Sequence, residues 1–457
     1  MTSGLLALAL CTLLALWLSG ARSLAWLAYY ASFVPFVTLD LADGAQTAEA
    51  LGSGVAQTKM FVRLAATGLA LLLTLPRRSA WSAFGERRLL PVVFLLLWAC
   101  LGLVGVEDAL VPLLRLGELA GFVLLGVLLW STSADEDATL RTRLRWHAVA
   151  LLPLLGITLV YTVMRPELAM HVADTGLVRM GNRLINAETL GTTAALLALW
   201  ATAELKEPRE HEAGFARERV LPFVCLVLAL GVLLFARSRT AMIATVAGEA
   251  LLWSPLFGAT RRQWATSLVL LVGGLVAAVA SVDAIGSWFL RGDSVANLKN
   301  GTGRTELWAH LLADSAPQHP LLGQGWLRLG EHGAFEHAGH PWTNAHNTYL
   351  GALLYMGVPG LVAVLAIFGI ALRAAWRRAR RPGPERGAWT LLLALFVLAA
   401  INSATSFGIV GWPNPLMLFF YGLFPLAVLG PRNEPEREFV EADELDLEPS
   451  ASAPSGA

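Results

Sequence analysis

Two arginines lie in a short turn between two long apolar runs of the chain. Arg237 and Arg239 open the sequence RSRTAMIA, directly after an apolar run that ends at Ala236. A guanidinium keeps its proton, and its planar fork binds two phosphate oxygens at once. The pair therefore indicates a site for an anionic, lipid-linked substrate such as a pyrophosphate. The alternative is that both side chains lie at a membrane surface and extend to lipid headgroups.

A second polar stretch leads into another apolar run. Residues 179–191 read RMGNRLINAETLG, which places Arg179, Arg183 and Asn186 close together along the chain. These side chains have two interpretations. Either they bind the same anionic substrate, or they cap and anchor a helix that enters a membrane.

A third candidate cation, Arg304, stands in the sequence GTGRTELW at 301–308. Apolar side chains recur after it at helical spacing and predict an amphipathic helix over about 304–316, with Arg304 in its first turn. Such a helix is expected to lie along a membrane surface. Its apolar positions are Leu307, Trp308, Leu311 and Leu312, and its candidate N-caps are Thr302 and Gly303.

His346 is the candidate general base. It opens the apolar run HNTYLGALLYMGVPG, for which Thr343 and Asn344 are the predicted N-caps. The positive end of a helix dipole and nearby arginines both disfavour a protonated imidazole, which leaves a neutral ring able to accept a proton. The alternative is a capping or interfacial histidine. Later in the run, Pro359 predicts a kink.

Histidines gather in the same region without forming a recognisable metal site. Six of the nine fall between His310 and His346, but their spacing matches no zinc pattern, so no metal and no cofactor is predicted. We interpret His332, His337 and His340 as solvated loop residues.

The composition places all of these residues in a membrane protein. The 457 residues are 56% hydrophobic and 15% charged, against about 25% charged in soluble domains. Lysine plus arginine balance aspartate plus glutamate at 34 each, which excludes a nucleic-acid partner. The fold class is therefore all-α, a polytopic membrane protein surrounded by membrane lipids.

Apolar runs long enough to span the bilayer predict 12–13 transmembrane helices. They lie at about 5–20, 24–39, 60–75, 89–106, 110–130, 146–163, 184–203, 220–236, 240–257, 264–282, 346–372, 388–408 and 412–429. Within these runs, Arg115 and Glu118 are predicted to pair, and Glu249 has no obvious partner.

Basic residues in the connections set the predicted orientation. One set of alternate loops holds 22 of the 34 basic residues and the other holds 10, so the first set is cytoplasmic. Residues 283–345 then form one large extracytoplasmic loop, which with Arg179, Arg237, Arg239 and His346 faces the outside. The tail 431–457 is predicted to be disordered and cytoplasmic.

Three of these segments together resemble the O-antigen ligase and O-antigen polymerase superfamily of bacterial membrane glycosyltransferases. They are RSRTAMIA at the start of a membrane helix, GTGRTELW followed by HPLLGQG in the large loop, and HNTYLGALLYMGVPG at the start of the next helix. The resemblance extends over about 175–425. One departure is NAETLG, where relatives usually read closer to Asn-Pro-Asn before a small residue, which puts the role of Asn186 and Glu188 in doubt.

The resemblance implies metal-independent, inverting transfer of a glycan from undecaprenyl diphosphate to an acceptor hydroxyl on the periplasmic face of the bacterial inner membrane. The residues themselves give the matching hypothesis, in which His346 takes the proton from that hydroxyl and the arginines neutralise the diphosphate. These arginines are Arg179, Arg237, Arg239 and Arg304, with Arg183 in reserve and Arg328 a weaker candidate. Asn186, Asn347 and Tyr349 are the remaining substrate-binding candidates, the last two for orienting the sugars.

The resemblance also implies a division of the chain and a choice of acceptor. Residues 1–163 would be N-terminal membrane helices, and 164–430 an O-antigen ligase-like catalytic membrane domain. An O-antigen ligase, with lipid A-core as acceptor, is the first choice. A polymerase that extends a lipid-linked growing glycan is the alternative. A polysaccharide flippase or other transporter is less favoured because the polar residues gather at one surface, and a non-catalytic glycan-binding protein stays open.

Overall fold

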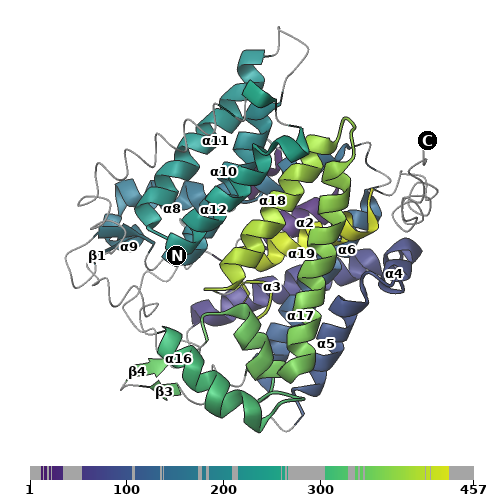
Figure 1. The fold of residues 1–457 in the computed structure, drawn as a ribbon, viewed down its shortest axis with the longest axis vertical. Helices are drawn as coiled ribbons and strands as arrows, with labels where there is room; N and C mark the ends of the chain where they lie inside the picture. The colour runs from purple at the N-terminus through teal and green to yellow at the C-terminus, as the bar shows by residue number, and fades with distance from the viewer. Residues whose placement is uncertain are drawn as a thin grey trace, which may run out of the picture.

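The computed structural model describes residues 23–33, 54–104, 109–133, 138–172, 178–181, 185–207, 215–258, 304–327, 345–406 and 413–431, with shorter pieces between them. Most of these residues are helical (Figure 1). Among the described residues, five helices are long and apolar enough to cross a membrane, and three shorter ones are also apolar. An all-α, multi-pass membrane protein is thus confirmed, while the total of 12–13 spans stays a prediction.

The helices follow the apolar runs of the sequence closely. Through the first half of the chain they are α2 (Leu24–Ala31), α3 (Gly54–Thr74), α4 (Arg78–Phe84), α5 (Leu90–Leu101), α6 (Leu110–Thr132), α7 (Leu140–Val149), α8 (Leu152–Met164), α9 (Pro166–Ala169) and α10 (Ala187–Lys206). The second half contains α11 (Phe215–Ala236), α12 (Arg239–Leu252), α16 (Arg304–His310), α17 (Thr348–Arg380), α18 (Arg386–Ser403) and α19 (Pro415–Leu429). The predicted run at 264–282 and the tail 432–457 lie outside the described residues.

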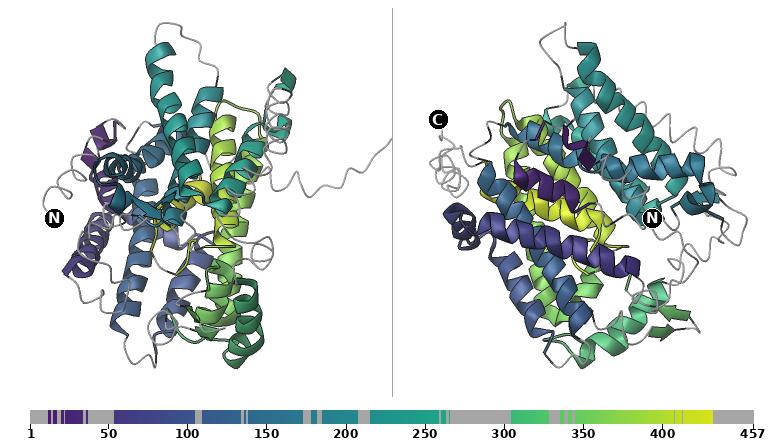
Figure 2. Two further views of the ribbon diagram at one scale, coloured as in Figure 1. Left: turned by 90° about the vertical axis from the view of Figure 1, so that its left-hand side faces the viewer. Right: turned by 180° about the vertical axis from the view of Figure 1, so that it is seen from behind.

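Two helices occupy the centre of the arrangement. Helix α10 packs against α11, α12 and α18, and α18 packs in turn against α12 and α17. Helix α19 packs on α6, which also contacts α3. Figures 1 and 2 show α16 at the opposite end of the molecule from the outer tip of α11.

Loops predicted on the same side of the membrane meet in the structure. Arg141 pairs with both Glu204 and Glu207, at 2.8 and 2.6 Å, and Arg386 donates to the Leu256 carbonyl at 2.7 Å. These residues belong to loops predicted to be cytoplasmic, except Leu256, which lies at the predicted cytoplasmic end of the run 240–257. The grouping agrees with the predicted alternation of loops, although which end faces the cytoplasm stays a prediction from the basic residues.

Helix α17 folds back on itself at Gly357. This residue has φ +67° and ψ −166°, a conformation outside the helical region. The rings of Tyr349 and Phe368 lie 5.8 Å apart, whereas an unbroken helix would separate the two positions by about 28 Å. A Cβ on Gly360 would lie 2.3 Å from the Met356 Cβ, so its missing side chain lets the two limbs meet. The limbs 348–356 and 358–380 therefore run back along each other, a larger change of direction than the kink predicted at Pro359.

The segment HPLLGQG holds this bend in place. Val358 donates its backbone N–H to the Pro320 carbonyl, and Gln324 donates its own to the Leu354 carbonyl, each at 2.7 Å. Trp98 on α5 donates its indole N–H to the Met356 carbonyl at 2.9 Å. These bonds satisfy backbone groups that the break in the helix releases. The motif is thus explained by packing rather than by chemistry.

Several local expectations are corrected. Asn347 caps α17, accepting from the Leu350 N–H at 3.0 Å, in place of the predicted Thr343 or Asn344. Two short antiparallel ribbons interrupt the polar loops, β1 (Met170–Val172) with β2 (Val178–Met180) and β3 (Phe335–His337) with β4 (His340–Trp342). The helix after Arg304 is confirmed, but Leu312 is exposed. Arg115 and Glu118 pair at 2.8 Å as predicted. Glu249 does have a partner, the Trp253 indole at 3.1 Å.

Candidate active site

The start of α10 supplies the acidic side chain of the site. Asn186 caps the helix, its Oδ1 accepting from the Glu188 N–H at 2.7 Å. Glu188 then accepts from Arg304 through Oε1 at 3.0 Å and from the Ser406 hydroxyl through Oε2 at 2.9 Å. Three segments far apart in the chain therefore meet at one carboxylate.

The turn between α11 and α12 packs directly on α10. A Cβ on Gly191 would lie 2.5 Å from the Ser238 Cβ, so only a glycine on α10 allows this approach. Gly191 lies three positions after Glu188, about one helical turn away. Arg237 adopts φ +52°, a left-handed conformation that is uncommon for a residue with a side chain. The turn that carries Arg237 and Arg239 is thereby brought beside Glu188.

Arg179, on β2, reaches the same turn from the other side. Its Nε donates to the Ala236 carbonyl at the end of α11, at 2.8 Å. Its Nη2 is buried without a hydrogen-bond partner among the described residues. Burial lowers the pKa of the Arg179 guanidinium; Glu188 opposes this shift, while Arg239 and Arg304 add to it. Three of the predicted arginines are therefore close enough to repel one another, as expected of a site that takes up an anion.

Arg304 is fixed at two points. Besides Glu188, its guanidinium donates to the Thr405 carbonyl at 2.7 Å, just beyond the end of α18. The Thr405 hydroxyl lies 2.5 Å from that of Thr240 on α12. The first residue of α16 is thus tied to the ends of α10 and α18, and through Thr405 to α12.

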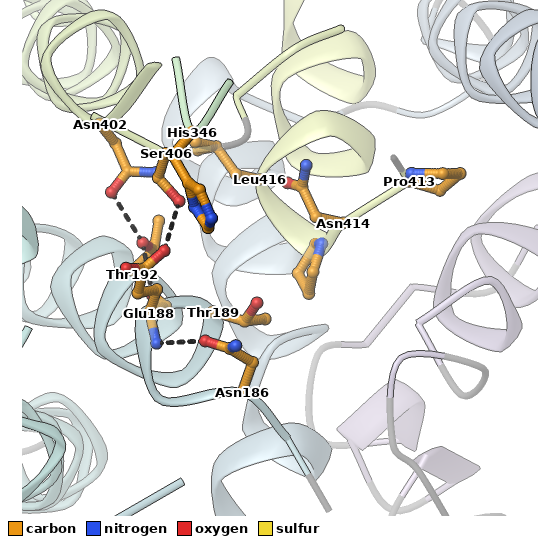
Figure 3. A pocket seen from close by; sticks show the side chains of 11 residues that line it. Asn186, Glu188, Thr189, Thr192, His346, Asn402, Ser406, Pro413, Asn414 and Leu416 are labelled. Atoms are coloured by element: carbon orange, nitrogen blue, oxygen red, sulfur yellow. Dashed lines mark hydrogen bonds between the residues drawn. The ribbon is translucent and has the colours of Figure 1, made fainter. Parts of the chain in front are cut away.

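His346 lines a cavity of about 190 Å³ together with Asn186, Glu188, Thr189, Thr192, Asn402, Ser406, Asn414 and neighbouring apolar residues. Figure 3 shows the side chains of Glu188, Asn402, Ser406 and His346 facing this cavity. The backbone of His346 has φ +47° and lies two residues before Thr348, whose hydroxyl donates to the Ser406 carbonyl at 3.2 Å. The imidazole is therefore held beside the polar end of α18.

The surroundings of His346 favour its neutral form. Burial lowers the pKa of the imidazole from its ordinary value of 6.5, the positive charge of Arg304 lowers it further, and Glu188 partly restores it. Both dominant effects disfavour the imidazolium. At neutral pH the ring is therefore able to accept a proton, which is what a general base must do.

Of the predicted site residues that the structure describes, Asn186 and His346 line the cavity, whereas the four arginines, Arg179, Arg237, Arg239 and Arg304, do not. Asn347 is used as the N-cap of α17, and the Tyr349 hydroxyl donates to the Ala400 carbonyl at 3.0 Å, so both side chains hold helices. Their predicted contact with sugars remains a prediction without geometric support. Arg183 and Arg328 lie outside the described residues.

Some residues of the cavity escaped prediction from the sequence. Asn402 accepts from the Thr192 hydroxyl at 3.0 Å, and Asn414 caps α19 by accepting from the Met417 N–H at 2.9 Å. The available signal was the polar run INSATS at the end of an apolar helix, followed by the Asn414-Pro415 pair. Such residues read equally well as helix ends, because Ser, Thr and Asn are the ordinary capping residues.

No cluster of three or more histidine, cysteine or acidic side chains able to hold a metal occurs among the described residues. The polar side chains assembled here are three arginines, one imidazole and one carboxylate, together with amides and hydroxyls. This set can bind a multiply charged anion and accept one proton beside it.

Comparisons with known proteins show which family this chain is similar to. A family model described as Wzy_C, O-Antigen ligase, matches residues 224–365, which include Arg237, Arg239, Arg304 and His346. A protein named O-antigen ligase from Pseudomonas aeruginosa strain PAO1 is 25% identical over 260 residues. That match covers 56% of this chain and 56% of the relative, so it spans about half the length of each. Together, the two matches support the O-antigen ligase superfamily as the family of this chain.

Proposed function

We propose that this protein transfers a glycan from undecaprenyl diphosphate to a hydroxyl of lipid A-core, at the periplasmic face of the inner membrane. The observation that carries the proposal is the hydrogen bond from Arg304 to Glu188 at the cavity that His346 lines. Arg239 and Arg304 also act electrostatically on Arg179. Guanidinium groups are suited to a diphosphate. A base next to them is suited to the hydroxyl that displaces it.

The proposed step is a single inverting displacement. The acceptor oxygen attacks the anomeric carbon while His346 takes its proton, and a new C–O bond forms. The bond between the anomeric carbon and the phosphate oxygen breaks, and its electron pair leaves with undecaprenyl diphosphate. The arginines offset the negative charge that develops on this leaving group. No metal and no cofactor takes part in this scheme.

The test is transfer by the purified protein from a lipid-linked glycan donor to lipid A-core, with and without a chelator. We expect transfer to lipid A-core at rates that agree within about twofold with and without the chelator, since the developing charge is met by arginines rather than by an ion. Loss of transfer on chelation would contradict metal independence. No transfer to any acceptor would contradict the proposed function.

Extension of a lipid-linked glycan is the second candidate, because a polymerase needs the same cationic site and the same base. The acceptors separate the two activities. Transfer to a second lipid-linked repeat unit, with none to lipid A-core, identifies a polymerase. A strain that lacks the gene accumulates long lipid-linked chains if the protein is a ligase, and single repeat units if it is a polymerase.

Arg304→Lys is expected to lower kcat/KM by about 30- to 100-fold. A lysine ammonium is a point charge and cannot hold the Glu188 carboxylate and the Thr405 carbonyl in the geometry of the guanidinium fork. Arg165→Lys is the matched control, since that arginine is exposed and pairs only locally with Glu167 at 2.7 Å. Steady-state transfer rates provide the measurement, and equal effects of the two substitutions would remove Arg304 from the site.

A further inference from the structure

Among the described residues, Glu188 is the acidic side chain whose negative charge offsets the positive charge of the arginines in the candidate active site. It lines the same cavity as His346, and its charge is felt by the imidazole. It also receives hydrogen bonds from Arg304 and Ser406 on its two carboxylate oxygens. A carboxylate placed against a substrate that carries phosphate would repel it, so this position requires an explanation.

The hydrogen bonds show what Glu188 does for Arg304. The guanidinium is held by the carboxylate on one side and by the Thr405 carbonyl on the other, at 3.0 and 2.7 Å. Two fixed contacts restrict the rotamers of a long side chain that otherwise loses much entropy when ordered. The remaining N–H groups of the guanidinium are therefore presented in a set direction before any substrate arrives.

Glu188 also bears on the proton that His346 accepts. Among the described residues, two charged side chains act on the imidazole. Arg304 from α16 disfavours the imidazolium, and Glu188 from α10 favours it. Burial acts in the same direction as Arg304. Without a negative charge nearby, a buried histidine beside an arginine would be a poor proton acceptor.

We propose that Glu188 is a positioning residue, which orients Arg304 toward the leaving diphosphate and stabilises His346 as it takes up the proton of the acceptor hydroxyl. The inference rests on the proposed function. It assigns the carboxylate an indirect role, because each of its oxygens already accepts a hydrogen bond from a protein side chain, one from Arg304 and one from Ser406.

The discriminating measurement is the pH dependence of transfer in Glu188→Gln. A general base works when neutral, so kcat/KM rises with pH through the pKa of His346 and then levels off. Removal of the negative charge lowers that pKa, so the acidic limb moves to lower pH by about one unit, while the plateau falls about tenfold because the base is weaker. Glu188→Asp keeps the charge and is expected to return the limb toward its wild-type position.

The matched control is Glu249→Gln, which removes another half-buried glutamate from a helix of this bundle. Glu249 lies ten positions along α12 from Arg239, about 15 Å away, and its carboxylate accepts from Trp253. We expect its pH profile to coincide with that of the wild type. A structural loss common to both variants would appear in their unfolding temperatures in detergent.

A second readout does not depend on transfer. Diethyl pyrocarbonate acylates neutral imidazole, so the extent of His346 modification against pH, read by mass spectrometry of its peptide, reports the pKa directly. In Glu188→Gln the midpoint is expected to move to lower pH, and an unmoved midpoint would overturn the proposal. Wild-type protein that shows this shift on substitution but transfers no glycan would contradict the proposed function and leave the link between Glu188 and His346 standing.

Discussion

His346→Ala is expected to reduce glycan transfer by about 100- to 10,000-fold, the range usual for removal of a general base. The imidazole lines the cavity beside Glu188 and Ser406, and its surroundings keep it neutral. The wild-type rate is expected to fall only below about pH 6.5, because the pKa of His346 is held under that ordinary value. Single-turnover transfer across pH provides the measurement, and in His346→Ala the acidic limb should disappear.

His310→Gln is the matched control for this prediction. That histidine is the last residue of α16. It pairs with Asp314 at 2.6 Å, and 38% of its side chain is exposed. It does not line the cavity. Its substitution should leave the rate and the pH profile as they are. His346→Ala protein that is folded and transfers glycan at the wild-type rate would remove the base from the proposed step.

Gly357→Ala is expected to destabilise the protein by about 3 kcal/mol or more, because the alanine would have to adopt a backbone conformation that is open essentially only to glycine. The residue has φ +67° and ψ −166°, and an added Cβ would lie 2.3 Å from the Leu321 carbonyl oxygen. Either α17 straightens or the HPLLGQG segment leaves its place. Both outcomes displace the limb that presents His346, so stability and transfer should fall together.

Thermal unfolding of purified protein in detergent measures this effect. Gly369→Ala is the control on the same helix, because nothing lies within 4 Å of a Cβ added there. Alanine favours a helix interior over glycine by about 1 kcal/mol, so this variant should be as stable as the wild type or slightly more so. Similar unfolding temperatures for the two variants would show that the bend does not depend on its glycine.

The sequence predicted the helices well because apolar runs and membrane thickness leave few alternatives. It also singled out Arg179, Arg239, Arg304 and His346 as candidates, because they are polar residues beside apolar runs on the side predicted to hold few basic residues. These four are brought together although they span 168 positions. The signal was a polar or charged residue beside an apolar run, which can be recognised without knowing which helices are neighbours.

The rest depended on packing that a linear pattern does not contain. The sequence left the role of Glu188 open, since NAETLG departs from the pattern of relatives, and the hydrogen bonds from Arg304 and Ser406 give it one. Tyr349 and Asn347 follow His346 closely, yet their side chains turn to Ala400 and to the helix backbone. The reversal of α17 at Gly357 was missed because a hydropathy pattern shows how apolar a segment is and does not show where the helix changes direction.

That reversal sets how far a substrate must travel. The limb 348–356 is nine residues long, about 13 Å, and it leads from the bend back toward the middle of the bundle. In the proposed orientation, His346 is therefore recessed by that depth from the outermost point of its own helix. In the proposed reaction, a polyprenyl carrier would keep its hydrocarbon chain among the acyl chains while its sugar end reacts, and the acceptor would have to descend to meet it.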